Sequence, residues 1–250
     1  VDSLPILPMS DRKVIARRAA MELPRNAVIN LGIGMPEGVS SVAVEEGFAD
    51  QLTMTVEAGQ IGGVPAAGAA FGGAYNPEFV NDMIRHFDFY DGGGLDVCFL
   101  GAAEVDSMGN CNVSKFTRTV GPGGFINIAS NTPKCVFCGT LTAGGLKTEI
   151  RDGKLSILQE GRNKKYMKQV KQVTFSGSNA VKSGQTVLFV TERAVFELDN
   201  DGIILTEIAP GIDLQTQVLD MIDFDVRVSP NLKLMDARIF AEGPMGLELK

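Results

Sequence analysis

Hydrophobic and polar positions follow helical and strand periods in turn along the chain, and this alternation predicts an α/β fold. Apolar residues recur at helical spacing in residues 11–23, which Ser10 is placed to cap, and again after Pro36, with Gly47 at the expected end. Short apolar runs lie between and after these helices and are expected as strands: residues 27–33, 52–57, 95–101, 125–129 and 134–138. Continuous apolar runs are typical of parallel strands covered on both faces.

The later part of the chain changes to antiparallel signals. Residues 149–158 predict a hairpin around an Asp152-Gly153 turn. Further strands are expected at 187–190, 195–198 and 203–207, and a helix at 214–222 with Asp213 as its cap. The expected fold is a mixed, mostly parallel sheet with an antiparallel part.

One further helix is expected from the Asn76-Pro77 pair onward. Its inward face would be formed by five apolar side chains, Phe79, Val80, Met83, Ile84 and Phe87.

Composition and charge limit the classes of partner that the chain is expected to bind. The chain of 250 residues carries 23 basic and 30 acidic residues, a net charge of −7. It has no long basic cluster, so neither a nucleic acid nor an anionic membrane surface is expected as a partner. It also has no apolar run near the ~20 residues that span a bilayer. Residues 1–10 contain two prolines and are interpreted as a linker of something longer, which leads into one folded domain, residues 11–250.

Four cysteines are present, and two of them form a Cys135-x-x-Cys138 pair that suggests a redox or metal site. The pair lies in an apolar strand-like run, where residues three apart point to opposite faces. We therefore interpret the thiols as small buried hydrophobic groups and not as a redox or metal site. A reducing, cytoplasmic location fits this cysteine usage.

The most informative stretch surrounds Glu57. On the expected strand, Thr53, Thr55 and Glu57 share the polar face. Glu57 thus lies at the carboxyl end of a strand, where open α/β sheets place their ligands. A carboxylate there can attack an activated acyl group and form an anhydride. The alternative is a structural glutamate that accepts hydrogen bonds from loop amides.

Two other stretches offer candidate chemistry. Glu104 and Asp106 follow an expected strand and are interpreted mainly as turn residues, with a ligand or metal role as the alternative. Gly123-Gly124, ahead of the expected strand 125–129, can aim backbone N–H groups at an oxyanion, although such glycine pairs are also common in loops. His86 is the single histidine, and no serine or cysteine shows a plausible partner in it, which disfavours a Ser-His-Asp hydrolase.

The ordered set of motifs resembles the family I CoA-transferases, most closely the C-terminal half of fused enzymes acting on short-chain acyl-CoAs, such as propionate and acetoacetate CoA-transferases. The resemblance covers nearly the whole chain. It runs through Ile29-Asn-Leu-Gly-Ile-Gly-Met-Pro36, Val56-Glu57-Ala-Gly59, Gly93-Gly-Leu-Asp-Val-Cys-Phe-Leu-Gly101, Gly121-Pro-Gly-Gly124, Thr191-Glu-Arg-Ala-Val-Phe196, Leu205-Thr-Glu-Ile-Ala-Pro-Gly211 and Val228-Ser-Pro230.

The resemblance implies a role for each matching residue. Glu57 would be the nucleophile of the family's Glu-x-Gly sequence, and the backbone of Gly59, Gly123 and Gly124 would serve the oxyanion or CoA. Two-subunit members often carry Ser-Glu-Asn-Gly, so the residues on either side of Glu57 differ here and leave substrate contacts open. The implied reaction is a ping-pong exchange through a glutamyl-CoA thioester, in which CoA is a substrate and no cofactor is needed.

The resemblance also implies a three-layer α/β/α fold. It implies an N-terminal domain or alpha subunit as companion, a homo-oligomeric full enzyme, acyl-CoA and carboxylate substrates, and a place in short-chain fatty acid, ketone body or propionate metabolism. Two other functions stay open. An acyl-CoA hydrolase on the same fold would resolve the thioester with water, and a non-catalytic binding half would use Glu57 only as a structural residue.

Overall fold

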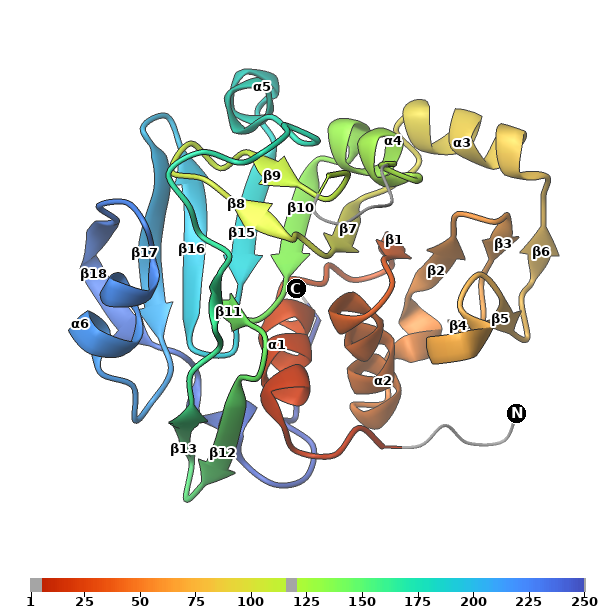
Figure 1. Cartoon of the computed structure of the whole chain (residues 1–250). Coiled ribbons are helices and arrows are strands. Elements are labelled where there is room, and N and C mark those ends of the chain that lie inside the picture. The colour runs from red at the N-terminus through yellow and green to blue at the C-terminus, as the bar shows by residue number, and fades with distance from the viewer. Residues whose placement is uncertain (1–5, 116–120, 250) are drawn as a thin grey trace.

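The computed structural model describes residues 6–115 and 121–249, which build one ten-stranded sheet with helices on both sides (Figure 1). The strand order is β18-β17-β16-β15-β10-β7-β1-β2-β3-β6. The central strands run parallel, namely β2 (Thr53–Val56), β1 (Val28–Leu31), β7 (Val97–Leu100), β10 (Lys134–Cys138) and β15 (Thr186–Val190). Their side chains are almost all buried, as continuous apolar strands require.

Antiparallel strands extend the sheet at both edges. On one side lie β16 (Ala194–Asp199), β17 (Gly202–Ile208) and β18 (Arg227–Leu234), of which β18 runs parallel to β17. On the other side, β3 (Gln60–Ile61) pairs with β2, and β6 (Phe79–Val80) pairs with β3. The prediction of a mixed, mostly parallel sheet is confirmed.

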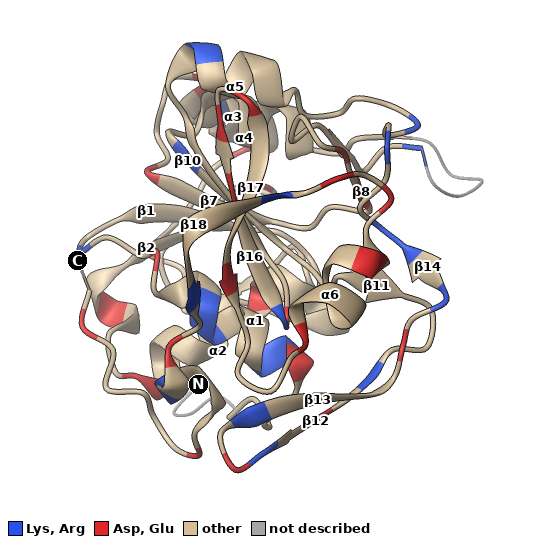
Figure 2. Ribbon diagram, turned by 90° about the vertical axis from the view of Figure 1, so that its left-hand side faces the viewer, with Lys and Arg blue, Asp and Glu red and all other residues tan. Residues whose placement is uncertain are grey.

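Helices cover both faces of the sheet and complete three layers. Figure 2 shows α1 (Asp11–Ala20) and α2 (Gly38–Glu45) on one side, and α3 (Met83–Asp91), α4 (Phe125–Asn131) and α5 (Gly177–Ser183) on the other. Shorter elements complete the described chain, and they are the 3-10 turns Met35–Glu37, Ala49–Gln51, Gly68–Ala70, Leu219–Met221 and Ala237–Phe240, the helix α6 (Leu214–Gln217), and the strands β4 (Val64–Pro65), β5 (Ala74–Tyr75), β8 (Glu104–Val105), β9 (Cys111–Asn112), β11 (Thr142–Ala143), β12 (Lys147–Arg151), β13 (Lys154–Gln159) and β14 (Asn163–Lys164).

Local signals set several boundaries as expected. Ser10 caps α1 by accepting from the Lys13 N–H, and Asp213 caps α6 by accepting from the Thr216 N–H. The Asp152-Gly153 turn joins β12 to β13 with both residues at positive φ. The predicted linker, residues 1–10, lies partly outside the described residues. Among those described, no helix has the length and apolar content that a membrane span requires.

The first helix ends at Ala20, earlier than the predicted residue 23. Pro24 accounts for this, because a residue before proline avoids the helical conformation.

The helix expected from Asn76-Pro77 is the clearest error. The chain there forms the edge strand β6, and α3 begins only at Met83, capped by Asp82. Of the five side chains predicted to face inward, four are more than half exposed, and these are Phe79, Val80, Met83 and Ile84. Phe87 alone is half-buried. Apolar residues at helical spacing therefore mark an uncovered surface here rather than a core-facing helix stripe.

Two further predictions of secondary structure are wrong. Residues 125–129 form the start of α4 rather than a strand, and the buried side chains Phe125, Ile128 and Ala129 follow helical spacing. Residues 214–222 do not form one helix, because α6 stops at Gln217 and a separate 3-10 turn follows.

Candidate active site at the carboxyl edge of the sheet

Glu57 directly follows β2, at the edge where the parallel strands β2, β1 and β7 all end. Its side chain lines a cavity of about 250 Å³. Strand ends and two loops supply the other walls, which are Asn30, Leu31, Gly32, Ile33, Phe71, Leu100, Gly101, Val113, Pro122, Gly123, Gly124, Phe125 and Ile128. The position that alternation predicted for Glu57 is thus a wall of a ligand-sized hollow.

The Glu57 carboxylate is poorly solvated and carries no counter-ion within the described residues. Burial raises the pKa of this carboxyl above its ordinary value of 4.5. Among the described residues no loop amide donates to the Glu57 side chain, so no such hydrogen bond supports a structural role for it. A carboxylate without stabilising partners is a better nucleophile than one held in hydrogen bonds.

Gly124 faces this carboxylate from the other wall. A Cβ atom at Gly124 would collide with Oε2 of Glu57 and with the Phe87 ring. The backbone of Gly124 is ordinary, with φ of −79°, so the glycine is needed for space and not for conformation. Gly123 differs, because its φ of +55° favours glycine. Within the described residues neither N–H donates to a protein acceptor.

The structure therefore brings Glu57, Gly123 and Gly124 together around one cavity. The glycine pair precedes a helix and not the predicted strand, since α4 starts at Phe125.

Gly59 lies in the turn that directly follows β2 and Glu57, and its role there is conformational. Its φ is +121°, and a Cβ atom would strike the carbonyl of Asn81 in the chain that leaves β6. The Asn81 N–H in turn donates to the Gly59 carbonyl at 2.8 Å. Gly59 thus fixes the turn that carries Glu57, and its predicted contact with the ligand stays a prediction.

Glu104 and Asp106 act as the turn reading predicted. Asp106 accepts from the Met108 and Asn110 N–H groups, both at 3.1 Å. Glu104 accepts from the Asn112 side chain and from the backbone and ammonium of Lys171, and these bonds lower its pKa despite burial. Both carboxylates hold loops together and neither lines the cavity of Glu57.

The cysteines are buried and free, as the strand reading predicted. Cys135 lies next to Cys98, with 3.5 Å between the sulfur atoms, while Cys138 contacts the Val136 carbonyl. Among the described residues no three His, Cys, Asp or Glu side chains gather as a metal site would require.

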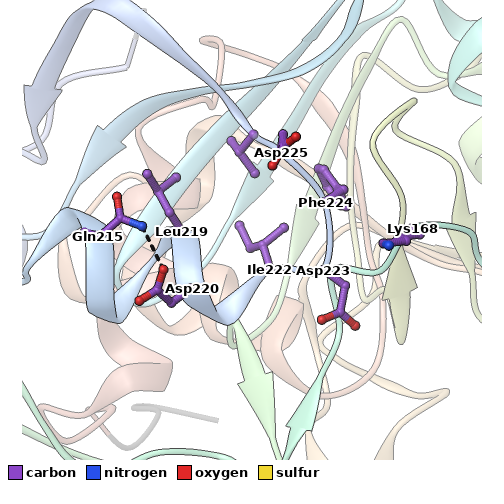
Figure 3. Close-up of a pocket in the computed structure, with 9 residues that line it drawn as sticks. Lys168, Gln215, Leu219, Asp220, Ile222, Asp223, Phe224 and Asp225 are labelled. Atoms are coloured by element: carbon purple, nitrogen blue, oxygen red, sulfur yellow. Dashed lines mark hydrogen bonds between the residues drawn. The ribbon is translucent and has the colours of Figure 1, made fainter.

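A larger and more open hollow lies beside α6, on a different part of the molecule (Figure 3). Some of its polar groups pair with one another or with a neighbour, since Gln215 donates to Asp220 at 2.7 Å and Lys164 pairs with Asp223 at 2.9 Å. It offers no carboxylate in an apolar setting comparable to Glu57.

Sequence reasoning missed a polar network that backs the cavity. His86 and Tyr90 lie one turn apart on α3, with 2.8 Å between His86 Nε2 and the Tyr90 hydroxyl. The same hydroxyl meets Asn30 of β1 and Thr55 of β2. The spacing of His86 and Tyr90 was visible in the sequence, but their partners are distant along the chain.

Comparisons with known proteins show close relatives in sequence. The chain is 53% identical over 244 residues to the acetate CoA-transferase YdiF of Escherichia coli K12, covering 97% of the chain and 46% of that protein. It is 51% identical to the caffeate CoA-transferase of Acetobacterium woodii, covering 99% and 48%. The chain is thus similar over nearly its whole length to proteins named CoA-transferases. No family model matches it.

Solved structures show the same similarity to CoA-transferases. A crystal structure of the acyl-CoA transferase of Escherichia coli O157:H7, described as a thioester complex with CoA, superposes with a TM-score of 0.92 at 50% identity, covering 99% of the chain and 47% of that protein. Glutaconate CoA-transferase of Acidaminococcus fermentans shares the fold, with a TM-score of 0.70 at 18% identity, covering 93% and 91%. The chain spans about half the length of these curated relatives.

Proposed function

We propose that this chain is the glutamate-bearing half of an enzyme that moves CoA from a short-chain acyl-CoA to a carboxylate. The observation that carries the proposal is the Glu57 carboxylate, half-buried and unpaired within the described residues, in a cavity opened for it by Gly124. The names of the relatives support the reaction class, since they are acetate and caffeate CoA-transferases.

In the proposed cycle Glu57 attacks the thioester carbonyl. The C–S bond breaks, which gives an acyl-glutamyl anhydride and CoA thiolate. The thiolate then attacks the glutamyl carbonyl of the anhydride, which forms a glutamyl-CoA thioester and releases the donor acid as its carboxylate. An acceptor carboxylate repeats the two steps in reverse, so Glu57 is regenerated and no proton or cofactor is consumed. The N–H groups of Gly123 and Gly124 are proposed to stabilise the oxyanions.

The test is a covalent adduct. The full-length protein, incubated with a short-chain acyl-CoA and denatured, should gain the mass of CoA less water on the peptide that contains Glu57. Addition of a carboxylate should discharge the adduct. An adduct that disappears in water alone at catalytic speed would establish the hydrolase instead. If several acyl-CoAs leave the mass unchanged, the chain is a binding half and the proposal is wrong.

We also propose a companion half, either an N-terminal domain of the same polypeptide or an alpha subunit. The chain covers under half of the single-chain relatives, but 90% of an Escherichia coli protein named acetate CoA-transferase subunit beta, at 28% identity. The exposed apolar row Phe79, Val80, Met83 and Ile84 supports a docking surface, because it begins on β6, which pairs with β3 next to the Glu57 turn. Edge strands with uncovered apolar side chains are typical of surfaces that a partner buries.

The substitution Ile84→Glu is expected to weaken docking of the companion half. Ile84 is 78% exposed in this chain, so the isolated fold tolerates a charge there, whereas a buried interface does not. In the full-length protein we expect kcat/KM to fall roughly tenfold or more and the junction between halves to become sensitive to protease. Leu158→Glu, at an equally apolar and 63% exposed site on β13, is the matched control and should change neither. Unchanged activity with dissociation into smaller oligomers would assign the row to contacts between copies.

The four free, buried cysteines support the proposal that the protein works in a reducing compartment, the cytoplasm.

A further inference from the structure

Four polar side chains form a buried cluster behind the cavity, at the junction of β1, β2 and α3. They are Asn30, Thr55, His86 and Tyr90, none of them more than 2% exposed. The Tyr90 hydroxyl is the centre of the cluster. It lies 3.1 Å from Asn30 Nδ2, 2.8 Å from Thr55 Oγ1 and 2.8 Å from His86 Nε2. Every one of these contacts joins atoms that water does not reach.

Counting protons fixes the direction of each bond. Thr55 Oγ1 donates its single proton to the Ile29 carbonyl at 2.8 Å, since a carbonyl only accepts. Thr55 must therefore accept from Tyr90, which uses the only proton of the Tyr90 hydroxyl. The phenol oxygen has two acceptor positions left, and they receive His86 Nε2–H and Asn30 Nδ2–H.

This count leaves the Asn30 carboxamide one orientation. If the amide were reversed, Oδ1 would face a phenol oxygen that has no proton to give. Nδ2 is thus held at Tyr90, and Oδ1 is turned away from it. The cluster resists titration, because burial, with a smaller effect of the Glu57 charge, raises the pKa of Tyr90 to about 12, and burial lowers the pKa of His86. Both groups keep the protons that the count assigns to them around neutral pH.

The cluster has two buried acceptors that receive no hydrogen bond from the described residues, His86 Nδ1 and Asn30 Oδ1. Of these two residues, Asn30 lines the cavity together with Glu57 and His86 does not. A buried carbonyl oxygen without a donor is unfavourable, because no hydrogen bond offsets the loss of its hydration. Such a cost in a ligand-sized cavity points to a donor on the ligand.

The proposed function names the donors available, and the inference rests on it. A carboxylate and a thioester carry no N–H or O–H at the reacting centre. The donor nearest the sulfur is the amide N–H of the CoA arm. We propose that Asn30 Oδ1 accepts a hydrogen bond from this amide N–H, and that Tyr90 and His86 are positioning residues which hold the Asn30 carboxamide for it.

In this arrangement the protein recognises the CoA part of the acyl-CoA substrate. An acceptor oxygen beside Glu57 repels a carboxylate and attracts an N–H, so it favours an acyl-CoA over a free acid. Selection among acyl groups is left to the apolar walls of the cavity.

The experiment measures two substrates with the wild-type protein, with one variant and with one control variant. The substrates are an acyl-CoA and an analogue in which the amide N–H nearest the sulfur is replaced by CH₂. In the full-length wild-type protein, loss of the N–H should lower kcat/KM roughly three- to tenfold. Tyr90→Phe removes the hydroxyl that orients Asn30, and it should reduce this preference to near unity. Tyr75→Phe, which removes an exposed hydroxyl from β5, should keep the full preference.

Three outcomes separate the claims. If Tyr90→Phe slows both substrates equally and keeps the wild-type preference, the positioning role is wrong. If Tyr90→Phe does not fold, Asn30→Ala is measured in its place and should also lose the preference; a retained preference overturns the inference. If the wild-type protein turns over no acyl-CoA and forms no adduct, the proposed function itself is wrong, whatever the role of Asn30.

Discussion

Replacing Glu57 by glutamine is expected to abolish CoA transfer and the covalent adduct while preserving the fold. The amide keeps the shape of the side chain but cannot act as the nucleophile. Every step of the proposed cycle takes place at the Glu57 carboxylate group, which the glutamine variant lacks. Loss of a covalent nucleophile lowers kcat by roughly 10⁴-fold or more. The rate and the intact mass of the variant, measured with a short-chain acyl-CoA, test this directly.

The same substitution should raise the melting temperature, and the gain should depend on pH. Burial raises the pKa of Glu57 in the folded chain, so the folded state binds the proton more tightly than the unfolded state does. Ionised Glu57 therefore destabilises the fold at neutral pH, and this effect disappears as the pH falls through the raised pKa. Glutamine should stabilise the protein at pH 7 and leave it unchanged in acid. A melting temperature that fell at neutral pH would mean that Glu57 makes structural bonds.

Glu57→Asp serves as the control for position. It retains the charge but retracts the carboxylate by one methylene. If the Glu57→Asp variant kept the full transferase rate, the rate would not depend on the position of the carboxylate. The close placement of the nucleophile that the cavity indicates would then be wrong.

Local pattern was sufficient for the central strands and for the place of Glu57. Alternation along residues 52–57 put the glutamate at a strand end, and the parallel register of β1, β2 and β7 made that end one wall of the cavity. The same reasoning failed where an apolar segment can be either a core element or an uncovered surface. The run from Phe79 to Ile84 has the apolar content of a core element, yet it lies at an uncovered edge of the sheet.

The polar network behind Glu57 was beyond sequence reasoning for a different reason. Asn30 and Tyr90 are 60 residues apart, and Thr55 and Tyr90 are 35 apart. They meet because β1 and β2 are neighbours and α3 packs over them. Each residue alone is unremarkable in its segment. Only their shared hydroxyl shows that the carboxamide of Asn30 has a fixed direction.

Gly124→Ala is the second change expected to have a large effect. Alanine suits the backbone there, with φ of −79°, so the fold should tolerate it and the melting temperature should change little. The added methyl group would occupy the position of Glu57 Oε2 and press on the Phe87 ring. Glu57 must then turn away from the thioester. Since displacement of a reacting group by about 1 Å can cost roughly 10²-fold, kcat should fall by about that factor or more.

Gly121→Ala is the matched control, because a methyl group there meets no atom of the described residues. Its rate should stay near that of the wild-type protein, as measured in the same acyl-CoA assay. Comparison with adduct formation sharpens the result: the Gly124→Ala variant should form the CoA adduct as slowly as it turns over, because the first attack of Glu57 is impaired. A variant that accumulated the adduct at the wild-type rate, yet turned over slowly, would place Gly124 in the second half of the cycle and not in the positioning of Glu57.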